Sequence, residues 1–328
     1  MPSSPRVTAA MVADRAGTSI ATVSLVVNGK DRGRVSAPIA ERVRAAVDEL
    51  GYVVDHAASS LARGSGDLVV LIAPDLSNPF FAEVIRGVRD TVGDRFQLVL
   101  SVTERGQQPA TADVRRFERL RPAGILVDAP ASGEDLVASV PVVQLDAPGG
   151  PDAVNYDLSP GVQELVAHLA GLGHRRIGYL DGTSRAATFA VRRELLHDAA
   201  RAADVAVSPV DARADLTVDA AAQVAAATLD AWLEDGVTAV VAAADTLAYG
   251  VLRAAAANGV AIPGQLAVAG FDDLPSSSVT APALTSVALP GADLGRAAAL
   301  RLLATLDGTA AEVPALPTRL VARASTTG

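Results

Sequence analysis

Four hydroxyl side chains lie close together near the start of the chain: Thr8, Ser19, Thr22 and Ser24. Each stands at the start of an expected helix or on the outer face of one. There it can donate to a phosphate oxygen beside backbone N–H groups of the helix N-terminus. The same hydroxyls also suit ordinary helix caps and solvent-facing positions. They indicate binding to a nucleic-acid backbone only if the surrounding elements present them on one face.

Residues 7–28, VTAAMVADRAGTSIATVSLVVN, have the pattern of two short helices joined by a tight turn. The helices are expected over Ala9–Ala16 and Ile20–Val27, each preceded by a hydroxyl cap, and Asn28 ends the second. Gly17 stands at the turn, where the chain reversal needs an unhindered backbone. One face of each helix is small and apolar: Val12, Ala13, Ala16, Val23, Val26 and Val27. This pattern is typical of a helix-turn-helix, whose second helix enters the DNA major groove.

A third helix is expected after the charged loop KDRGR, with Ser36 as its cap. Ile39, Val43, Val47 and Leu50 repeat at helical spacing and would complete a three-helix core. Beyond it, residues 55–62 are only weakly helical, and the Gly-Ser-Gly at 64–66 is expected to form a flexible joint.

From Leu68 the sequence alternates between apolar strands and helices. Strands are expected over 68–73, 97–101, 124–127, 142–145, 177–180, 239–243 and 266–269. Helices are expected over 80–92, 111–120, 161–171, 187–202, 218–233 and 246–258. Continuous apolar strands that alternate with helices form parallel sheets covered on both faces. The fold class is therefore α/β, with two doubly wound lobes and a cleft between them.

The composition limits the possible class of protein. The chain has 328 residues, a net charge of −9 and no cysteine, which excludes disulfides and thiol chemistry. It has neither a secretory signal nor a long apolar run, so we expect a cytoplasmic protein that does not cross a membrane. Residues 1–63 carry a net charge of +2 and the remainder −11. Only the N-terminal part is thus suited to DNA, with modest and salt-sensitive affinity.

The sequence does not contain the usual catalytic motifs. The Gly-x-Gly of GLGHRR precedes an expected strand instead of following one, so it is not a dinucleotide-binding loop. Phosphate-loop and nucleophile-elbow motifs do not occur. The histidines are not spaced like metal ligands: His56, His168, His174 and His197. We therefore expect no enzyme, cofactor or metal site.

Five further motifs follow the helix-turn-helix in order: VSAPIAERVRAAVDELGY, PDLSNPFFAEVIRGV, GHRRIGYLDG, ADTLAYGVLRA and VAGFDDLPSSSVTAPALTSV. Together they resemble the lactose-repressor family of bacterial transcription regulators over nearly the full chain. The resemblance implies a three-helix DNA-binding domain at 1–63, with a linker helix over about 55–63. It implies a type I periplasmic-binding-protein-like body at 64–328. One lobe would comprise about 67–158 and 291–318, and the other about 159–290 and 319–328.

The resemblance also implies a homodimer whose two recognition helices read a pseudo-palindromic operator in double-stranded DNA. Leu61 would insert into the minor groove as an apolar wedge, and Ala58 would lie where the paired linker helices meet. Ile20, Ala21 and Leu25 depart from the family pattern, since none can donate to base edges. They can contact thymine methyl groups, so we expect apolar contact and DNA shape to dominate recognition. Alternatively, they pack on the third helix and binding is weak. The expected DNA contacts are Thr8, Ser19, Ile20, Ala21, Thr22, Ser24, Leu25, Asn28, Ala58 and Leu61.

In the family that this chain resembles, effectors bind between the lobes, outside the carboxyl ends of the strands. The positions carried over are Asp75, Phe81, Arg105, Asp146, Thr188, Arg192, Asp245 and Asp272. Arg192 and Asp272 could each bind two hydroxyls of a polyhydroxylated, carbohydrate-like ligand, or form a salt bridge without one. Ala244, where asparagine is usual, and Leu216, near a stacking tryptophan of the family, weaken the case for a sugar. A phosphorylated sugar, a nucleoside or another polar metabolite stays open.

The sequence thus predicts an effector-controlled transcription regulator, expected to be a repressor. A solute receptor and a DNA-binding protein without an effector remain alternatives. Retention on DNA at low salt would separate the first alternative from a regulator.

Overall fold

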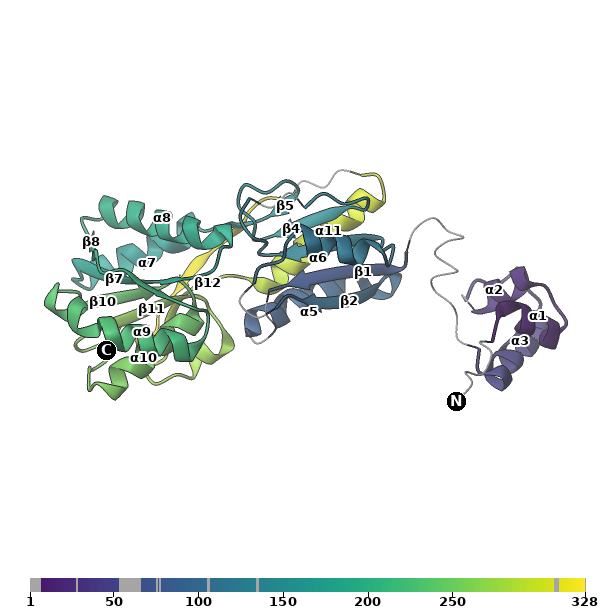
Figure 1. Ribbon diagram of the computed structural model, residues 1–328, viewed down its shortest axis with the longest axis horizontal. Coiled ribbons are helices and arrows are strands. Elements are labelled where there is room, and N and C mark those ends of the chain that lie inside the picture. Colours follow the sequence, from purple (N-terminus) through teal and green to yellow (C-terminus); the bar gives the residue numbers. More distant parts are fainter. Residues whose placement is uncertain are drawn as a thin grey trace. The chain divides into compact units, whose positions relative to one another are not determined.

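The computed structural model describes residues 7–27, 29–52, 66–74, 76, 78–104, 107–133, 136–309 and 313–327. The chain divides into two compact units, Met1–Gly66 and Asp67–Gly328. Figure 1 labels their helices and strands.

The described part of the first unit is a three-helix domain of α1 (Ala9–Ala16), α2 (Ile20–Val27) and α3 (Ala37–Leu50). Gly17 ends α1 with a left-handed φ of 64°, and α1 and α2 meet at a bend of 101°. That angle is in the range of helix-turn-helix motifs. The buried core consists of Val12, Ala13, Ala16, Val23, Val26, Ala40, Val43 and Ala46.

The apolar face of α3 is rotated from the predicted one. Ala40 and Ala46 are fully buried, Val47 and Leu50 pack at the edge of the core, and Ile39 lies outside it. Small side chains are needed where three short helices cross closely, so Ala40 and Ala46, which we did not predict for the core, are buried there beside the predicted Val43.

Within the described residues, no single helix is long and apolar enough to span a membrane; α1 and α2 together pass such a test by length and composition. Val12 and Val23 of this pair are nevertheless buried in the three-helix core.

The second unit has two lobes. The first lobe is a parallel sheet in the order β2-β1-β3-β4-β5. Its strands are β1 (Leu68–Ala73), β2 (Gln97–Val102), β3 (Gly124–Asp128), β4 (Val142–Leu145) and β5 (Ala153–Val154). α5 (Pro79–Val92) and α11 (Gly291–Leu306) cover one face and α6 (Thr111–Glu118) the other. Alternate residues of β1 enter the two cores, Val69 and Leu71 one, Val70 and Ile72 the other, as the period of a strand requires.

The second lobe is a seven-stranded sheet in the order β14-β12-β11-β10-β7-β8, with β9 paired to β7. Its strands are β7 (Arg176–Gly182), β8 (Ala206–Val207), β9 (Ala212–Ala214), β10 (Ala239–Ala242), β11 (Ala267–Asp272), β12 (Thr285–Ala288) and β14 (Arg319–Val321). Its helices are α7 (Ser159–Gly171), α8 (Ala187–Ala202), α9 (Val218–Glu234) and α10 (Asp245–Ala257). α7 and α8 lie on one face and α9 and α10 on the other (Figure 1).

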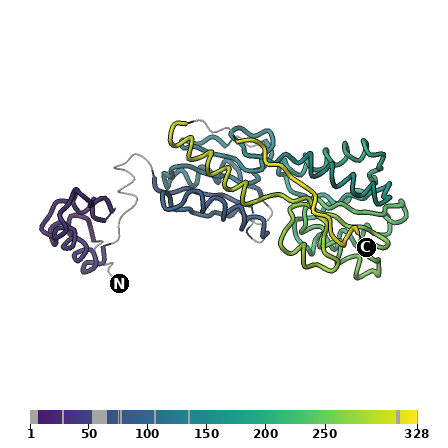
Figure 2. The backbone as a smooth tube through the Cα atoms, turned by 180° about the vertical axis from the view of Figure 1, so that it is seen from behind, coloured from purple at the N-terminus to yellow at the C-terminus, as the bar shows by residue number. Residues whose placement is uncertain are grey.

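The two lobes interleave in sequence. The described chain passes from the first lobe to the second through β6 (Tyr156–Asp157), and returns between β12 and α11. It crosses again through β13 (Leu316–Pro317), which pairs with β6. Figure 2 shows the last crossing as the yellow segment that runs from α11 along the second lobe. Short crossings of this kind permit the lobes to move about a hinge.

Helices α5 and α11 pack with their backbones in contact. A Cβ atom on Gly87 would lie 2.0 Å from the Ala292 carbonyl oxygen, and one on Gly295 would lie 2.1 Å from that of Val84. Glycine is therefore required on both helices. This crossing ties the late segment α11 to the first lobe.

Candidate functional site

Hydroxyl side chains begin the first two helices of the N-terminal domain. Thr8 Oγ1 accepts from the Met11 amide at 3.4 Å, and Ser19 Oγ accepts from the Thr22 amide at 3.1 Å. The Ser19 and Thr22 hydroxyls lie 2.9 Å apart. Thr8 and Ser19 thus cap α1 and α2, and the capped ends present backbone N–H groups that suit phosphate oxygens.

The outer face of α2 carries apolar and small polar side chains. Ile20 is 55% exposed, Ala21 and Ser24 are exposed, and Thr22 and Leu25 are half-buried. Ile20, Ala21 and Leu25 do not belong to the three-helix core. The structure therefore gives no support to the alternative in which they pack into the core with α3.

Five of the residues predicted for DNA or effector binding lie outside the described residues. They are Asn28, Ala58, Leu61, Asp75 and Arg105.

A cavity of about 550 Å³ lies between the lobes of the second unit. It is bordered by Phe81 and Asp146 from the first lobe, and by Thr188, Arg192 and Asp272 from the second. All five were predicted effector residues, and the fold brings them together. The strand-end positions, Asp146 after β4 and Asp272 at the end of β11, explain this, because the carboxyl ends of both sheets border the cavity.

Arg192 is the centre of the charge arrangement. Its Nη1 donates to the Ala243 carbonyl oxygen at 2.7 Å and to Asp272 Oδ1 at 3.2 Å. Its Nη2 lies 4.0 Å from Asp146 Oδ2, across the cleft. The guanidinium carbon is 5.3 Å from the ring centres of both Phe189 and Phe271, close enough for cation–π attraction. The guanidinium is thus held in one position, ready to orient a polar ligand.

Burial perturbs the carboxyl groups around Arg192. It raises the pKa of Asp272 to about 6, although the nearby guanidinium opposes the shift. It also raises the pKa of Asp146, again against the effect of Arg192. Both residues have positive φ angles, 46° for Asp146 and 106° for Asp272. Backbone strain of this kind is common at binding sites, where it aims side chains that regular structure would not.

Several buried polar atoms of this cavity have no hydrogen-bond partner in the described protein. They are both carboxylate oxygens of Asp128, Oδ1 of Asp146, Oγ1 of Thr188 and Nε of Arg192. Buried polar groups are almost always hydrogen-bonded in proteins. A polar ligand seated here would supply the missing partners.

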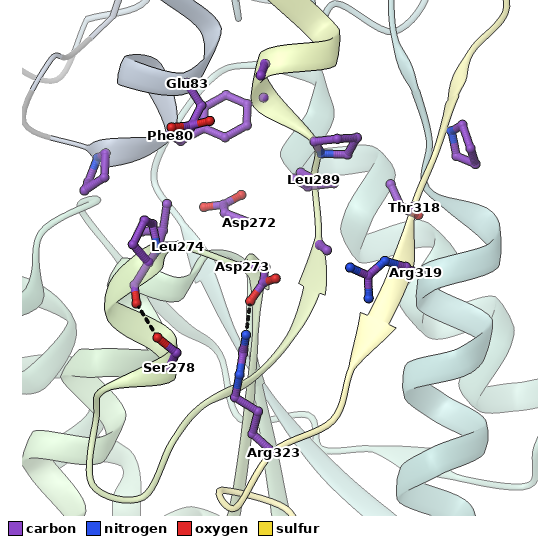
Figure 3. Close-up of a pocket in the computed structure, with 17 residues that line it drawn as sticks. Phe80, Glu83, Asp272, Asp273, Leu274, Ser278, Leu289, Thr318, Arg319 and Arg323 are labelled. Atoms are coloured by element: carbon purple, nitrogen blue, oxygen red, sulfur yellow. Dashed lines mark hydrogen bonds and ion pairs between the residues drawn. The ribbon is translucent and has the colours of Figure 1, made fainter. Parts of the chain in front are cut away.

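A second cavity of about 680 Å³ lies at the crossings between the lobes (Figure 3). Phe80 and Leu289 give it apolar walls, and the Asp273 carboxylate there is paired with Arg323 at 2.6 Å. Asp272 borders both cavities. Glu83 and Arg319 also border this second cavity. Because Asp273 and Glu83 are already paired, with Arg323 and Arg86, and much of the wall is apolar, it is less suited to a polar ligand than the first.

Comparisons with known proteins agree with this arrangement. Residues 10–55 match the family described as "Bacterial regulatory proteins, lacI family", and residues 166–326 match "Periplasmic binding protein-like domain". The HTH-type transcriptional repressor CytR of Escherichia coli is 30% identical over 311 residues, which cover 90% of this chain and 89% of CytR. The chain belongs to the lacI family of bacterial regulatory proteins. It is therefore a DNA-binding regulator of transcription.

Other lacI-family proteins are similar over the whole length. The HTH-type transcriptional regulator MalR of Streptomyces coelicolor is 33% identical over 96% of this chain and 95% of its own. The lac repressor dimer bound to operator and the anti-inducer ONPF is 26% identical, with a TM-score of 0.84 over 99% of this chain and 100% of that one. A CelR–cellobiose complex is 29% identical, with a TM-score of 0.70 over 98% and 100%.

Asp245 is a correction to the predicted effector set of this lacI-family regulator, because it does not border the cavity. It is fully buried, and its oxygens accept from Ser286 Oγ at 2.6 Å, the Leu274 amide at 2.9 Å and Ser277 Oγ at 2.5 Å. Burial, with the charge of Asp272, raises its pKa to about 7. Asp245 therefore joins β12 to the turn after β11 and holds these segments together outside the cavity lining.

Sequence reasoning missed Asp128 and Phe189, which both line the cavity. Asp128 is the last residue of β3, and the predicted strand stopped one residue before it. A carboxylate that directly follows a buried strand was the available signal. Leu216 and Ala244, which weakened the sugar hypothesis, do line the cavity.

Proposed function

We propose that this lacI-family regulator is a repressor whose affinity for DNA is changed by a polar small molecule bound between its lobes. The observation that carries the proposal is the cavity of about 550 Å³, where five predicted residues from both lobes converge beside buried polar atoms without protein partners. The cellobiose named for CelR and the anti-inducer named for the lac repressor support a small-molecule effector.

We also propose a homodimer that binds a pseudo-palindromic operator in the cytoplasm. The lac repressor was solved as a dimer on its operator. On this chain, β2 is an edge strand that exposes Leu100 and Val102, and Val279 beside the turn after β11 is 80% exposed. These exposed apolar side chains are available for contacts between two copies of the chain. Two copies would add their modest phosphate affinities, which suits the small positive charge of the N-terminal domain.

The exposed side chains of α2 favour a particular kind of operator. Ile20 and Ala21 are exposed and offer only apolar contact. We therefore propose that each half-site is read through thymine methyl groups and DNA shape, with phosphates positioned by the capped helix ends.

The test is selection of binding sites from random duplex DNA by the purified full chain. The selected sites should be palindromic, rich in thymine where α2 contacts bases, and bound with an affinity that falls steeply with salt. Failure to enrich any sequence, or an invariant guanine opposite Leu25, would contradict the proposal.

Two substitutions then separate the two activities. Leu61→Ala should reduce operator affinity and leave small-molecule affinity nearly intact, because Leu61 is proposed to act only on DNA. Arg192→Ala should abolish the response to the small molecule and preserve operator binding. If either variant lost both activities equally, the proposed division of labour would be wrong.

A further inference from the structure

Acidic side chains predominate on the described lining of the cavity between the lobes. Asp128, Asp146, Asp215 and Asp272 border it, and Arg192 is the guanidinium that faces them. Arg192 is shared by Asp272 and Asp146, at 3.2 and 4.0 Å. Asp215 is exposed and accepts a hydrogen bond from Thr183. The described lining therefore holds more carboxyl groups than Arg192 alone can pair.

Asp128 differs from the other three carboxylates. Its side chain is 1% exposed, and neither of its oxygens has a hydrogen-bond partner in the described protein. An isolated buried carboxylate is strongly unfavourable, and proteins normally pair it with a cation or donors. Thr188 Oγ1 and Asp146 Oδ1, also buried and without partners, border the same cavity. The site therefore presents carboxylate acceptors, together with the Thr188 hydroxyl and the Arg192 Nε donor, that a ligand rich in polar hydrogens would satisfy.

We infer that the effector is a polyhydroxylated molecule with a protonated primary amine, such as an amino sugar, and that Asp128 receives the ammonium group. The inference rests on the proposed function, since it assigns the ligand class of the same cavity. Hydroxyl groups of the ligand bind Thr188, Asp146 and the pair of Arg192 with Asp272. The ligand ring lies against Phe81 and Phe189, which border the cavity.

An organic cation fits better than a metal ion. Among the described residues, no group of three or more His, Cys, Asp or Glu side chains is arranged to hold a metal. Calcium and magnesium need several oxygen ligands gathered at close range. An ammonium group needs only one buried carboxylate and two further acceptors, which this cavity provides.

Proton release on binding gives the inference a distinctive signature. Burial raises the pKa of Asp128 well above the usual range of a carboxyl group, and the charge of Asp146 raises it further. Tyr156, also near Asp128, keeps its proton because burial and the three aspartates raise the pKa of its hydroxyl. Asp128 therefore holds a proton in the free protein and releases it when the ammonium binds. Affinity for the amine should rise with pH as long as the amine stays protonated.

The experiment is calorimetric titration of the full chain with matched sugar pairs at pH 7. The pairs are glucosamine with glucose, galactosamine with galactose and mannosamine with mannose. At least one amino sugar should bind about 10-fold or more tightly than its neutral partner, the range expected of a charged hydrogen bond. Asp128→Asn should lower the affinity for that amino sugar by about 10- to 100-fold and change the affinity for the neutral sugar by less than about 3-fold. It should also reduce the increase of affinity between pH 5 and pH 7, leaving the part that comes from Asp272, whose pKa is raised to about 6.

Asp94→Asn is the matched control. Asp94 is an exposed carboxylate of the same lobe that does not border the cavity, and its variant should keep the preference for the amine. The inference is overturned if neutral sugars bind as tightly, if the preference persists in Asp128→Asn, or if no amino sugar binds. A sugar that binds without changing operator affinity would instead refute the proposed function, and the amine preference would stand.

Discussion

The substitution Arg192→Leu tests the charge arrangement of the cavity most stringently. The Arg192 side chain is 5% exposed, and those of Asp146 and Asp272 are each 7% exposed. Leucine fills much of the space between Phe189 and Phe271 but cannot balance either carboxylate. Removing one partner of a buried ion pair typically costs about 3–5 kcal/mol, because the remaining charge is left uncompensated. We expect a loss of this size in the free energy of unfolding at pH 8.

The loss should depend on pH in a definite direction. Because the pKa of Asp272 is raised to about 6, above that of an unfolded aspartate, this group lowers stability as the pH rises towards 6 and adds no further change above it. Without Arg192 the pKa of Asp272 moves higher, so stability of the variant keeps falling beyond pH 6. Each pH unit adds up to about 1.4 kcal/mol to the difference from the wild type. At pH 5, where Asp272 is mostly protonated, the loss should be only about 1–2 kcal/mol.

Urea unfolding at pH 5 and pH 8 measures the effect. Trp232, the chain's single tryptophan, is fully buried in α9 of the second lobe and reports unfolding by its fluorescence. Arg201→Leu is the control, because Arg201 lies on α8 with Arg192. Its ion pair with Asp198 is exposed, at 78% and 67%, and should contribute less than about 0.5 kcal/mol. Equal losses for Arg192→Leu at the two pH values, or a loss below about 1 kcal/mol at pH 8, would refute the reasoning.

Three further predictions follow from the packing and the charges. Gly87→Ala should cost about 2 kcal/mol or more in thermal unfolding, because its Cβ would meet the Ala292 carbonyl; a loss below about 0.5 kcal/mol would show that α5 and α11 can separate easily. Ile20→Ala should weaken operator binding several-fold without changing stability, whereas Val23→Ala on the same helix should cost about 1–3 kcal/mol; equal stability losses would place Ile20 in the core. Asp128→Asn should raise the melting temperature more at pH 8 than at pH 5, because the pKa of Asp128 is raised and its ionisation destabilises the fold; no pH dependence would contradict this.

Local patterns predicted the elements whose formation depends on their own residues. β1 and α8 have the predicted bounds, because a continuous apolar run and a long stretch of helix formers specify them locally. α11 was not predicted, since Gly291 and Gly295 are poor helix formers. These glycines are present because α5 approaches too closely for a side chain, and packing between distant segments is not visible in a local pattern.

Prediction of the effector residues from the sequence has a similar limit. Asp245 and Asp272 both follow buried apolar runs, so the sequence gives them the same signal. They differ because Asp272 ends β11 with a φ of 106° and borders the cavity, whereas Asp245 begins α10 and bonds to Ser277 and Ser286. Only the backbone geometry of each strand end decides which carboxylate reaches the cleft.

The central claim is that the position of the lobes sets the affinity for DNA, and it can be tested without knowing the effector. Ala131 and Ala186 form an isolated antiparallel bridge between the lobes. Cα atoms in such a bridge are about 4.5–5.5 Å apart, within the range that a disulfide spans. The chain has no cysteine of its own, so the double variant Ala131→Cys, Ala186→Cys can be locked without competing thiols.

The measurement is the dissociation constant for the selected operator before and after reduction of this disulfide, with the two single-cysteine variants as controls. Coupling of about 1–3 kcal/mol between the lobes and DNA predicts that the oxidised and reduced forms differ at least about 5-fold, while the single variants do not respond. Identical affinities for the locked and the reduced forms would contradict the account.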